Sequence, residues 1–220
     1  MGTPKIKRMA ILHRREGDDR AFFQHHWLTV HGAVVAGLPH LRSYLQNHVL
    51  EDFVPRGSEP TFKVDGFVEH LWDNAAEMQE GFRPDSEQVK AMLADEPNYI
   101  GHGTNYAMLY NEPLYPATEG NKLISIIRHR GDIKIAAALE EKARALPGCT
   151  RVIRDDVVAI IPKFGMEEPP VPVDCFLQIY FHDSEAASRA GNKLVNEGAT
   201  TCKDPNAAIG LVRVRTETII

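Results

Sequence analysis

Short segments in which apolar and polar residues alternate are separated along the chain by longer segments whose apolar residues recur at helical spacing. A period of two residues predicts a strand, and a period near 3.6 predicts a helix. In the first half the order is β-α-β-β-α-β, which is the order of ferredoxin-like folds. The expected strands are 6–13, 41–49, 66–72 and 106–110. The first expected helix is capped by Asp18 or Asp19 and ended by Gly37 with Pro39, and the second, at 75–92, is broken near Arg83 and Pro84.

The same order recurs in the second half. Leu38-Pro39 returns 108 residues later as Leu146-Pro147, and the segment 65–69 returns 109 residues later as 174–178. Such self-similarity predicts two tandem ferredoxin-like repeats, with domains at residues 1–116 and 117–220. The expected strands are 123–127, 152–161, 176–181 and 209–214, and the expected helices are 133–145 and 183–195.

A four-stranded sheet of this type covers one face with its own helices and leaves the other face bare. A bare apolar face would be a large exposed patch, so it has to be covered. Two copies in one chain can cover each other by packing sheet to sheet. The predicted fold class is therefore α+β, an intramolecular α+β barrel of eight strands, closed or nearly closed, with helices outside and room for one small ligand.

Composition narrows the range of partners. The 220 residues are 43% hydrophobic and 25% charged, with a net charge of −5, which argues against nucleic acid or an anionic membrane as a main partner. No apolar segment reaches 18 residues, so no membrane span is expected. Three cysteines without a CxxC pair indicate free thiols and a cytoplasmic protein. The expected partner is a small-molecule substrate, and pairing of two chains as a homodimer is left open.

Histidines are concentrated between residues 22 and 48, which hold five of the ten in the chain. On an α-helix, His26, Trp27 and His31 share the apolar side, whereas His25 points away. His26 and His31 would lie about 140° apart, at opposite edges of the apolar stripe. Half-buried imidazoles can be neutral near pH 7 and can carry protons. The alternative is a pair of structural histidines bonded to backbone carbonyls.

Two strand segments add polar groups. Tyr44 and Gln46 share one strand face, with His48, and could meet a polar substrate edge or lie on a partly solvated face. His48, like His40, is expected to be solvated. Glu69 lies between the apolar alternates Phe67 and Leu71, so an interior position would desolvate it and raise its pKa. A paired structural carboxylate is the alternative.

The remaining candidates are mainly aromatic. Phe22, Phe23 and Trp72 are expected in the core, although an aromatic pocket would use the same side chains. His102 lies in a glycine-containing loop that could close over a pocket or form a surface turn. No His pair at i,i+4, HExxH motif, phosphate-binding loop or nucleophile elbow is present, so no metal is expected.

Three blocks of residues occur in order at spacings similar to those of the EthD family of the dimeric α+β barrel superfamily. The resemblance covers residues 5–112, where Asp95-Glu96 and Glu112 also match the family's ending, whereas residues 121–220 resemble only the superfamily fold. The blocks are Phe22, His26, Trp27, His31 and Gly32, then Leu38, Pro39, Leu41, Tyr44, Gln46 and Asn47, then Asp65, Gly66, Glu69, Trp72 and Asp73.

The resemblance implies a protein that acts on small molecules without a cofactor. Relatives include lactone isomerases, dehydratases or decarboxylases, and monooxygenases that act on phenols without metal or flavin. The ligand would lie between helix and sheet near Trp27 and His31. Fold alone does not determine the reaction.

These observations predict a cofactor-free isomerase or lyase for a cyclic, largely apolar aromatic, polyketide or lactone-like molecule. His31 would be the general base or acid, and His26 a second proton carrier, with Tyr44 or Glu69 assisting. A cofactor-free monooxygenase of phenolic substrates and a non-catalytic small-molecule-binding protein are the alternatives. The expected substrate-binding residues are Phe22, Phe23, Trp27, Gln46, Phe67, Trp72 and His102.

Overall fold

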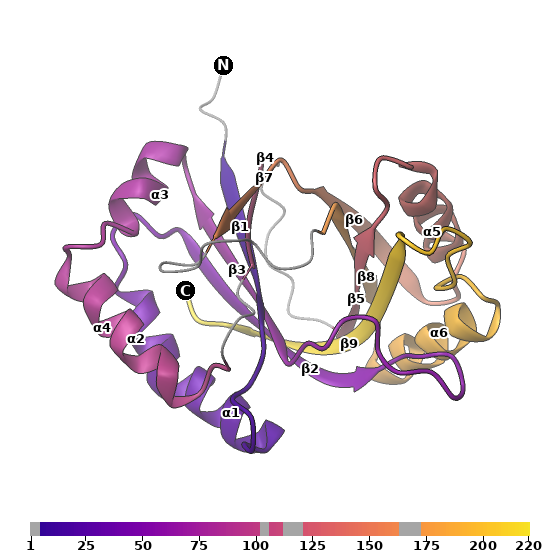
Figure 1. Ribbon diagram of the computed structural model, residues 1–220, viewed down its shortest axis with the longest axis horizontal. Helices are drawn as coiled ribbons and strands as arrows, with labels where there is room; N and C mark the ends of the chain where they lie inside the picture. Colours follow the sequence, from indigo (N-terminus) through magenta and orange to yellow (C-terminus); the bar gives the residue numbers. More distant parts are fainter. Residues whose placement is uncertain (1–4, 102–105, 112–120, 163–172) are drawn as a thin grey trace.

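The computed structural model describes residues 5–101, 106–111, 121–162 and 173–220. In these ranges the chain is α+β, as expected, with one curled antiparallel sheet and helices on its outside (Figure 1). The strands are β1 Ile6–Leu12, β2 Ser43–Asp52, β3 Gly66–Trp72, β4 Tyr106–Asn111, β5 Asn121–Arg128, β6 Cys149–Asp156, β7 Ala159–Pro162, β8 Cys175–Phe181 and β9 Ala208–Thr218.

The helices match the expected positions with one difference in detail, a π-helical turn within the first expected helix. That helix is capped by Asp19, one of the two predicted cap residues, and the second is broken, as predicted, before Ser86 caps its second part. None of the helices in the described ranges is long and apolar enough to cross a membrane. The helices are α1 Arg20–His26, the π turn Trp27–His31, α2 Gly32–Ala36, α3 Ala75–Gly81, α4 Glu87–Asp95, α5 Lys134–Arg144 and α6 Ser184–Asn196.

Strand order in the sheet is β6-β8-β5-β9-β2-β3-β1-β4-β7, with every neighbouring pair antiparallel. The first four strands therefore lie in the order β4-β1-β3-β2. The strands of the second half lie in the equivalent order β9-β5-β8-β6. Hydrogen bonds between β2 and β9 join the two groups edge to edge in one sheet.

The two edges of this sheet meet at one place in the chain. The single strand expected at 152–161 is wrong, because Val157 and Val158 separate β6 from β7. β6 pairs with β8 at one edge, and β7 pairs with β4 at the other. The chain thus passes from one edge of the curled sheet to the other within two residues, which no local period of apolar residues encodes.

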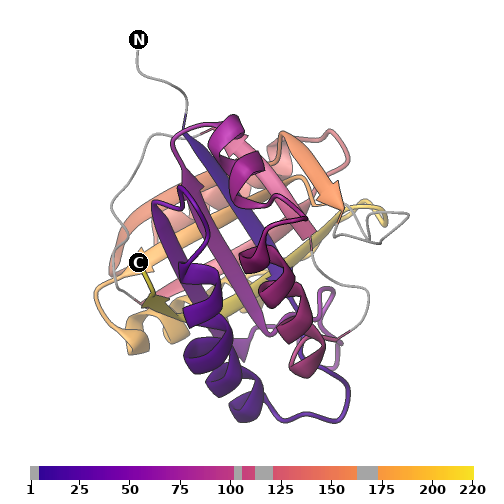
Figure 2. The ribbon, with the colours of Figure 1, turned by 90° about the vertical axis from the view of Figure 1, so that its left-hand side faces the viewer.

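Both faces of the first-half strands are covered (Figures 1 and 2). The outer face packs against α1, the π turn, α2, α3 and α4. Figure 2 shows α1, α2 and α4 lying across these strands. The inner face meets the strands of the second half, where Phe67 contacts Phe176 edge to face at 6.1 Å. Successive residues of a strand therefore enter two different buried environments.

Candidate active site

The space between the helices and the outer face of β2 and β3 contains most of the site residues predicted from the sequence. Phe23, Trp27 and Tyr44 are fully buried there, together with Tyr99, which follows a short 3-10 turn at the end of α4. An aromatic layer of this kind excludes water, so polar groups inside it interact strongly.

The π turn changes the relation between the two histidines. Its backbone hydrogen bonds skip one residue more than those of an α-helix, as in the bond from the Gly32 amide to the Trp27 carbonyl. The 140° separation expected for an α-helix is therefore wrong, because five residues now make about one turn and His26 and His31 point toward the same neighbour. Such turns are frequent at functional sites.

That neighbour is Asp95, the last residue of α4. Its Oδ1 lies 2.9 Å from His26 Nε2, and its Oδ2 lies 2.9 Å from His31 Nδ1. Both imidazole rings also contact the Tyr99 ring, with centroids 5.1 and 4.9 Å away. His31 is 5% exposed, and His26 is partly buried. The two histidines thus share one carboxylate instead of separate backbone carbonyls.

Electrostatics determine which nitrogen of His31 carries its proton. Partial burial would raise the pKa of Asp95, but hydrogen bonds with His26, Asn98 and His31 hold that pKa below its usual value. Burial lowers the pKa of His31, despite the opposing effect of Asp95. A neutral His31 must therefore donate Nδ1–H to the ionised carboxylate and keep its lone pair on Nε2. Among the described residues Nε2 has no hydrogen-bond partner, which is the arrangement of a general base.

This assignment predicts that His31 is neutral at pH 7 with its proton on Nδ1. Because its pKa lies below the usual 6.5, the ring should gain a second proton only in more acidic solution. Nitrogen-15 chemical shifts of His31, recorded across a pH titration, measure both properties. A neutral ring protonated on Nε2, or a charged ring at pH 7, would contradict the assignment.

A chain of buried hydrogen bonds connects the helix to β2. Trp27 Nε1 donates to Tyr44 Oη at 3.0 Å, and Gln46 Nε2 donates to the same oxygen at 2.7 Å. His48 Nε2 donates to Gln46 Oε1 at 3.0 Å. Burial raises the pKa of Tyr44, so this phenol stays protonated near neutral pH and keeps an O–H that can donate while its oxygen accepts. The expectation of a solvated His48 is wrong, and so is the partly solvated face for Tyr44 and Gln46.

Glu69 lies apart from this group. It projects from the inner face of β3, as does Phe67, whereas the histidines lie beyond the outer face. Its expected pKa increase is wrong. Burial acts in that direction, but the positive charges of Lys122 and Lys7 outweigh it and lower the pKa. Glu69 Oε1 is 2.9 Å from Lys122 Nζ, and Oε2 is 2.7 Å from Lys7 Nζ, so it is a paired carboxylate.

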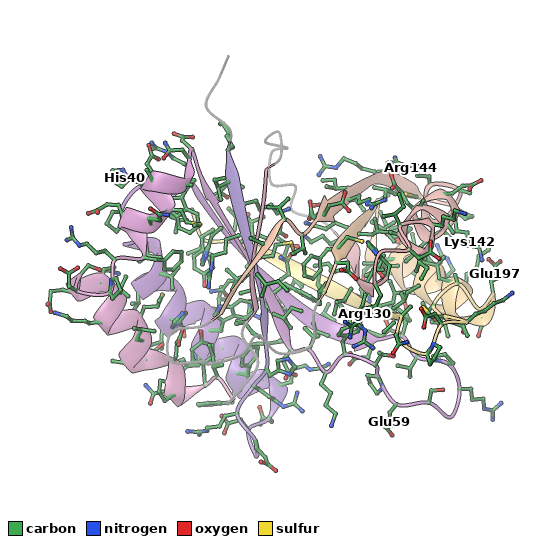
Figure 3. All side chains as sticks on the ribbon, turned by 45° about the horizontal axis from the view of Figure 1, so that its top comes forward. His40, Glu59, Arg130, Lys142, Arg144 and Glu197 are labelled. Atoms are coloured by element: carbon green, nitrogen blue, oxygen red, sulfur yellow. The ribbon has the colours of Figure 1, made fainter. Side chains whose placement is uncertain are left out.

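The other predicted residues are dispersed. Trp72 is buried on the outer face beside Phe82, and His40 is exposed on the surface, as labelled in Figure 3. The core position expected for Phe22 is wrong, because its side chain is 45% exposed at the rim, against the His26 ring. His102 lies outside the described residues.

In the parts of the chain that the structure describes, no group of three or more His, Cys, Asp or Glu side chains is arranged so that it could hold a metal ion.

Sequence reasoning assigned no role to four residues of this layer: Asp95, Tyr99, Arg8 and His70. The sequence could have identified Arg8 as a buried charge. In a barrel with helices outside, both faces of a strand are covered, so the adjacent residues Lys7 and Arg8 cannot both reach water. Asp95 stands out in the sequence only as part of the family-like ending Asp95-Glu96, and no periodicity along the chain links it to His31, which is 64 residues away.

The chain is similar to several solved structures and, over part of its length, to one protein family. No curated protein matches the sequence. A crystal structure of a candidate monooxygenase from Fusobacterium nucleatum is similar over 99% of this chain and 95% of its own, with TM-score 0.55 and 10% identity. A second candidate monooxygenase, from Lactobacillus acidophilus, covers 99% of this chain and 95% of its own at TM-score 0.43 and 11% identity.

Two findings concern the first half alone. An EthD-family protein from Bacillus halodurans aligns with 50% of this chain and 99% of its own, at 19% identity and TM-score 0.39. The EthD domain family itself matches residues 15–103, a range that contains the His26–Asp95–His31 group. Within the first half, residues 15–103 of this chain are therefore similar to the EthD domain family.

Proposed function

We propose that this protein is an enzyme of the isomerase or lyase type that transfers a proton on a cyclic, largely apolar small molecule. The observation that carries the proposal is a buried His31 that is oriented by Asp95 and whose Nε2 has no hydrogen-bond partner among the described residues. Burial lowers the pKa of His31, which favours the neutral ring. A carboxylate that fixes the tautomer of an imidazole is a recurring arrangement in general-base catalysis.

Each residue has a defined part in this reaction. His31 Nε2 takes a proton from a carbon next to a carbonyl, and Asp95 stabilises the imidazolium that forms. Tyr44, held protonated by burial, donates to the substrate oxygen. His26, on the other oxygen of Asp95, is a second proton carrier near the rim. The proton carriers are all side chains, so this step requires no cofactor.

The alternatives use the same layer differently. In a monooxygenase the carbanion formed by His31 would react with oxygen, which requires the same first proton transfer. In a non-catalytic binding protein the aromatic residues would hold a ligand, and His31 would only contribute affinity.

His31→Ala tests the proposal. Cyclic enones, lactones and phenols would be incubated with the protein in deuterium oxide, and deuterium incorporation next to the carbonyl followed by NMR. The wild type should exchange at least one compound, and His31→Ala should lower the rate by about a hundred- to ten-thousand-fold while ligand binding remains. His25→Ala, on the exposed side of the same helix, is the matched control.

The outcomes separate the three functions. A full exchange rate in His31→Ala would exclude His31 as the base. Binding of compounds without exchange in the wild type would indicate the non-catalytic function. Oxygen consumption during turnover, measured with an electrode, would indicate the monooxygenase.

We also propose that residues 1–116 and 117–220 are tandem ferredoxin-like units, the second of which completes the barrel without a site of its own. The equivalent strand orders support this. Buried polar residues at equivalent positions of the two halves also support it. Lys7 and Lys122 are each the second residue of the first strand of their half, and Glu69 and Gln178 are each the fourth residue of the equivalent strands β3 and β8.

A further inference from the structure

Arg8 on β1 has an unusual environment. Its side chain lies in the helix-covered layer, partly buried, with the guanidinium 4.6 Å above the Phe82 ring and NH1 3.2 Å from His70 Nδ1. Among the described residues no carboxylate lies within ion-pair distance, although the charge of Glu96 acts on Arg8 from further away. Its neighbour Lys7, on the other face, contacts both Glu69 and Asp155.

A desolvated cation without a counter-ion is costly. Burial lowers the pKa of Arg8 to about 10, which still leaves the guanidinium charged at neutral pH. Most of its five N–H groups have no acceptor in the described residues. An anion that entered this layer would therefore meet a charge that nothing in the described protein neutralises by contact.

The tautomer of His70 follows from the same contact. Arginine can only donate, so His70 Nδ1 must accept, and its proton must lie on Nε2. Burial and the positive charge of Arg8 hold the pKa of His70 well below its usual value, so the ring is neutral. His70 is 3% exposed, and its Nε2 has no partner among the described residues. Beside Arg8, this layer thus contains a buried donor without an acceptor among the described residues.

These donors lie beside the proposed base. The His70 ring is 4.8 Å from the Tyr44 ring, and protonation of His31 would disfavour protonation of His70. Tyr99 Oη is a further buried polar atom without a partner among the described residues, and its ring contacts that of His31. Unpaired buried groups are rare in folded proteins and require an explanation.

We propose that Arg8 and His70 bind the carboxylate of the substrate, so that the substrate is a cyclic or aromatic organic acid. Guanidinium and imidazole N–H groups would each donate to one carboxylate oxygen, and charge-assisted bonds of this type are strong. The ring of the acid would then extend toward Trp27 and His31. The substrate class rests on the proposed function, but carboxylate binding by itself does not.

Binding of sodium benzoate and of benzamide tests this subsite, because the two molecules share a ring and differ in charge. Titrations followed by NMR at constant ionic strength should show that the wild type binds benzoate at least about tenfold more tightly than benzamide. Arg8→Gln should lose this preference. Arg42→Gln is the matched control, because Arg42 is exposed and pairs with Asp73, and it should keep the preference.

Further measurements separate this inference from the proposed function. The His31→Ala variant should still bind benzoate more tightly than benzamide even when proton exchange is lost. If Arg8→Gln does not fold, the nitrogen-15 shifts of the Arg8 guanidinium and of His70 Nε2 in the wild type should change with benzoate and not with benzamide. Equal binding of the two probes by the wild type, or an unchanged preference in Arg8→Gln, would overturn the subsite whatever the result of the exchange assay.

Discussion

Glu69→Gln is expected to lower the free energy of unfolding by about 3–5 kcal/mol, the range seen when one partner of a buried ion pair is removed. Glu69 is 5% exposed and contacts two lysines, Lys7 and Lys122, on the inner face of the curled sheet. The substitution keeps the size of the side chain but removes the carboxylate that both buried lysines contact. The remaining carboxylate, Asp155, contacts Lys7. Chemical unfolding followed by circular dichroism measures the difference.

The effect should be large because this cluster joins strands from both halves. Asn47 and Gln178 also donate to Glu69, at 2.8 and 3.0 Å. Gln178 Nε2 also donates to Asp155 on β6, close to Val157 and Val158, where the chain passes from one edge of the sheet to the other. Glu87→Gln is the control, because Glu87 is exposed and its ion pair with Lys90 lies in solvent. This variant should have the same free energy of unfolding as the wild type within measurement error.

The same cluster predicts a pH dependence. The pKa of Glu69 is lower in the folded than in the unfolded state, so its contribution is complete above the unfolded value of about 4.3 and is lost as pH falls toward the folded value. The difference between wild type and Glu69→Gln should therefore shrink below about pH 4. A difference that is small at pH 7, or independent of pH, would contradict a stabilising ionic cluster.

Asp95→Asn is expected to lower kcat by about a hundred- to ten-thousand-fold on any substrate that the exchange assay identifies. The amide offers one acceptor oxygen where the carboxylate offers two, and its NH2 group favours the tautomer of His31 with the proton on Nε2. The base would then be blocked although its ring remains in place. Steady-state kinetics measure the loss, and KM should change much less than kcat.

A pH profile distinguishes this positioning role from a structural one. Asp95 raises the pKa of His31 against the larger effect of burial, so its removal should shift the acidic limb of the profile to lower pH. Asp85→Asn, which changes an exposed carboxylate paired with Arg83, should alter neither the rate nor the profile. Loss of activity with an unchanged acidic limb would assign Asp95 a structural role only.

The sequence predicted well what depends on neighbours along the chain. Alternation in β3 placed Glu69 on one face and His70 on the other, and helical spacing placed Trp27 inward and His25 outward. It did not reveal the π turn, because one extra residue per turn leaves the pattern of apolar residues almost unchanged. It also misplaced Phe22, which lies at the edge of the apolar stripe.

By itself the sequence determined the order of most elements, the resemblance of the first half to EthD proteins, and Phe23, Trp27 and Tyr44 of the aromatic layer. Only the tertiary structure decided that His26 and His31 meet on Asp95, that Glu69 lies between two lysines, and that the chain passes from one edge of the curled sheet to the other at Val157 and Val158. The reason is physical. Periodicity reports which face of an element is buried, whereas pairing of charges 53 to 69 residues apart depends on how the faces are brought together.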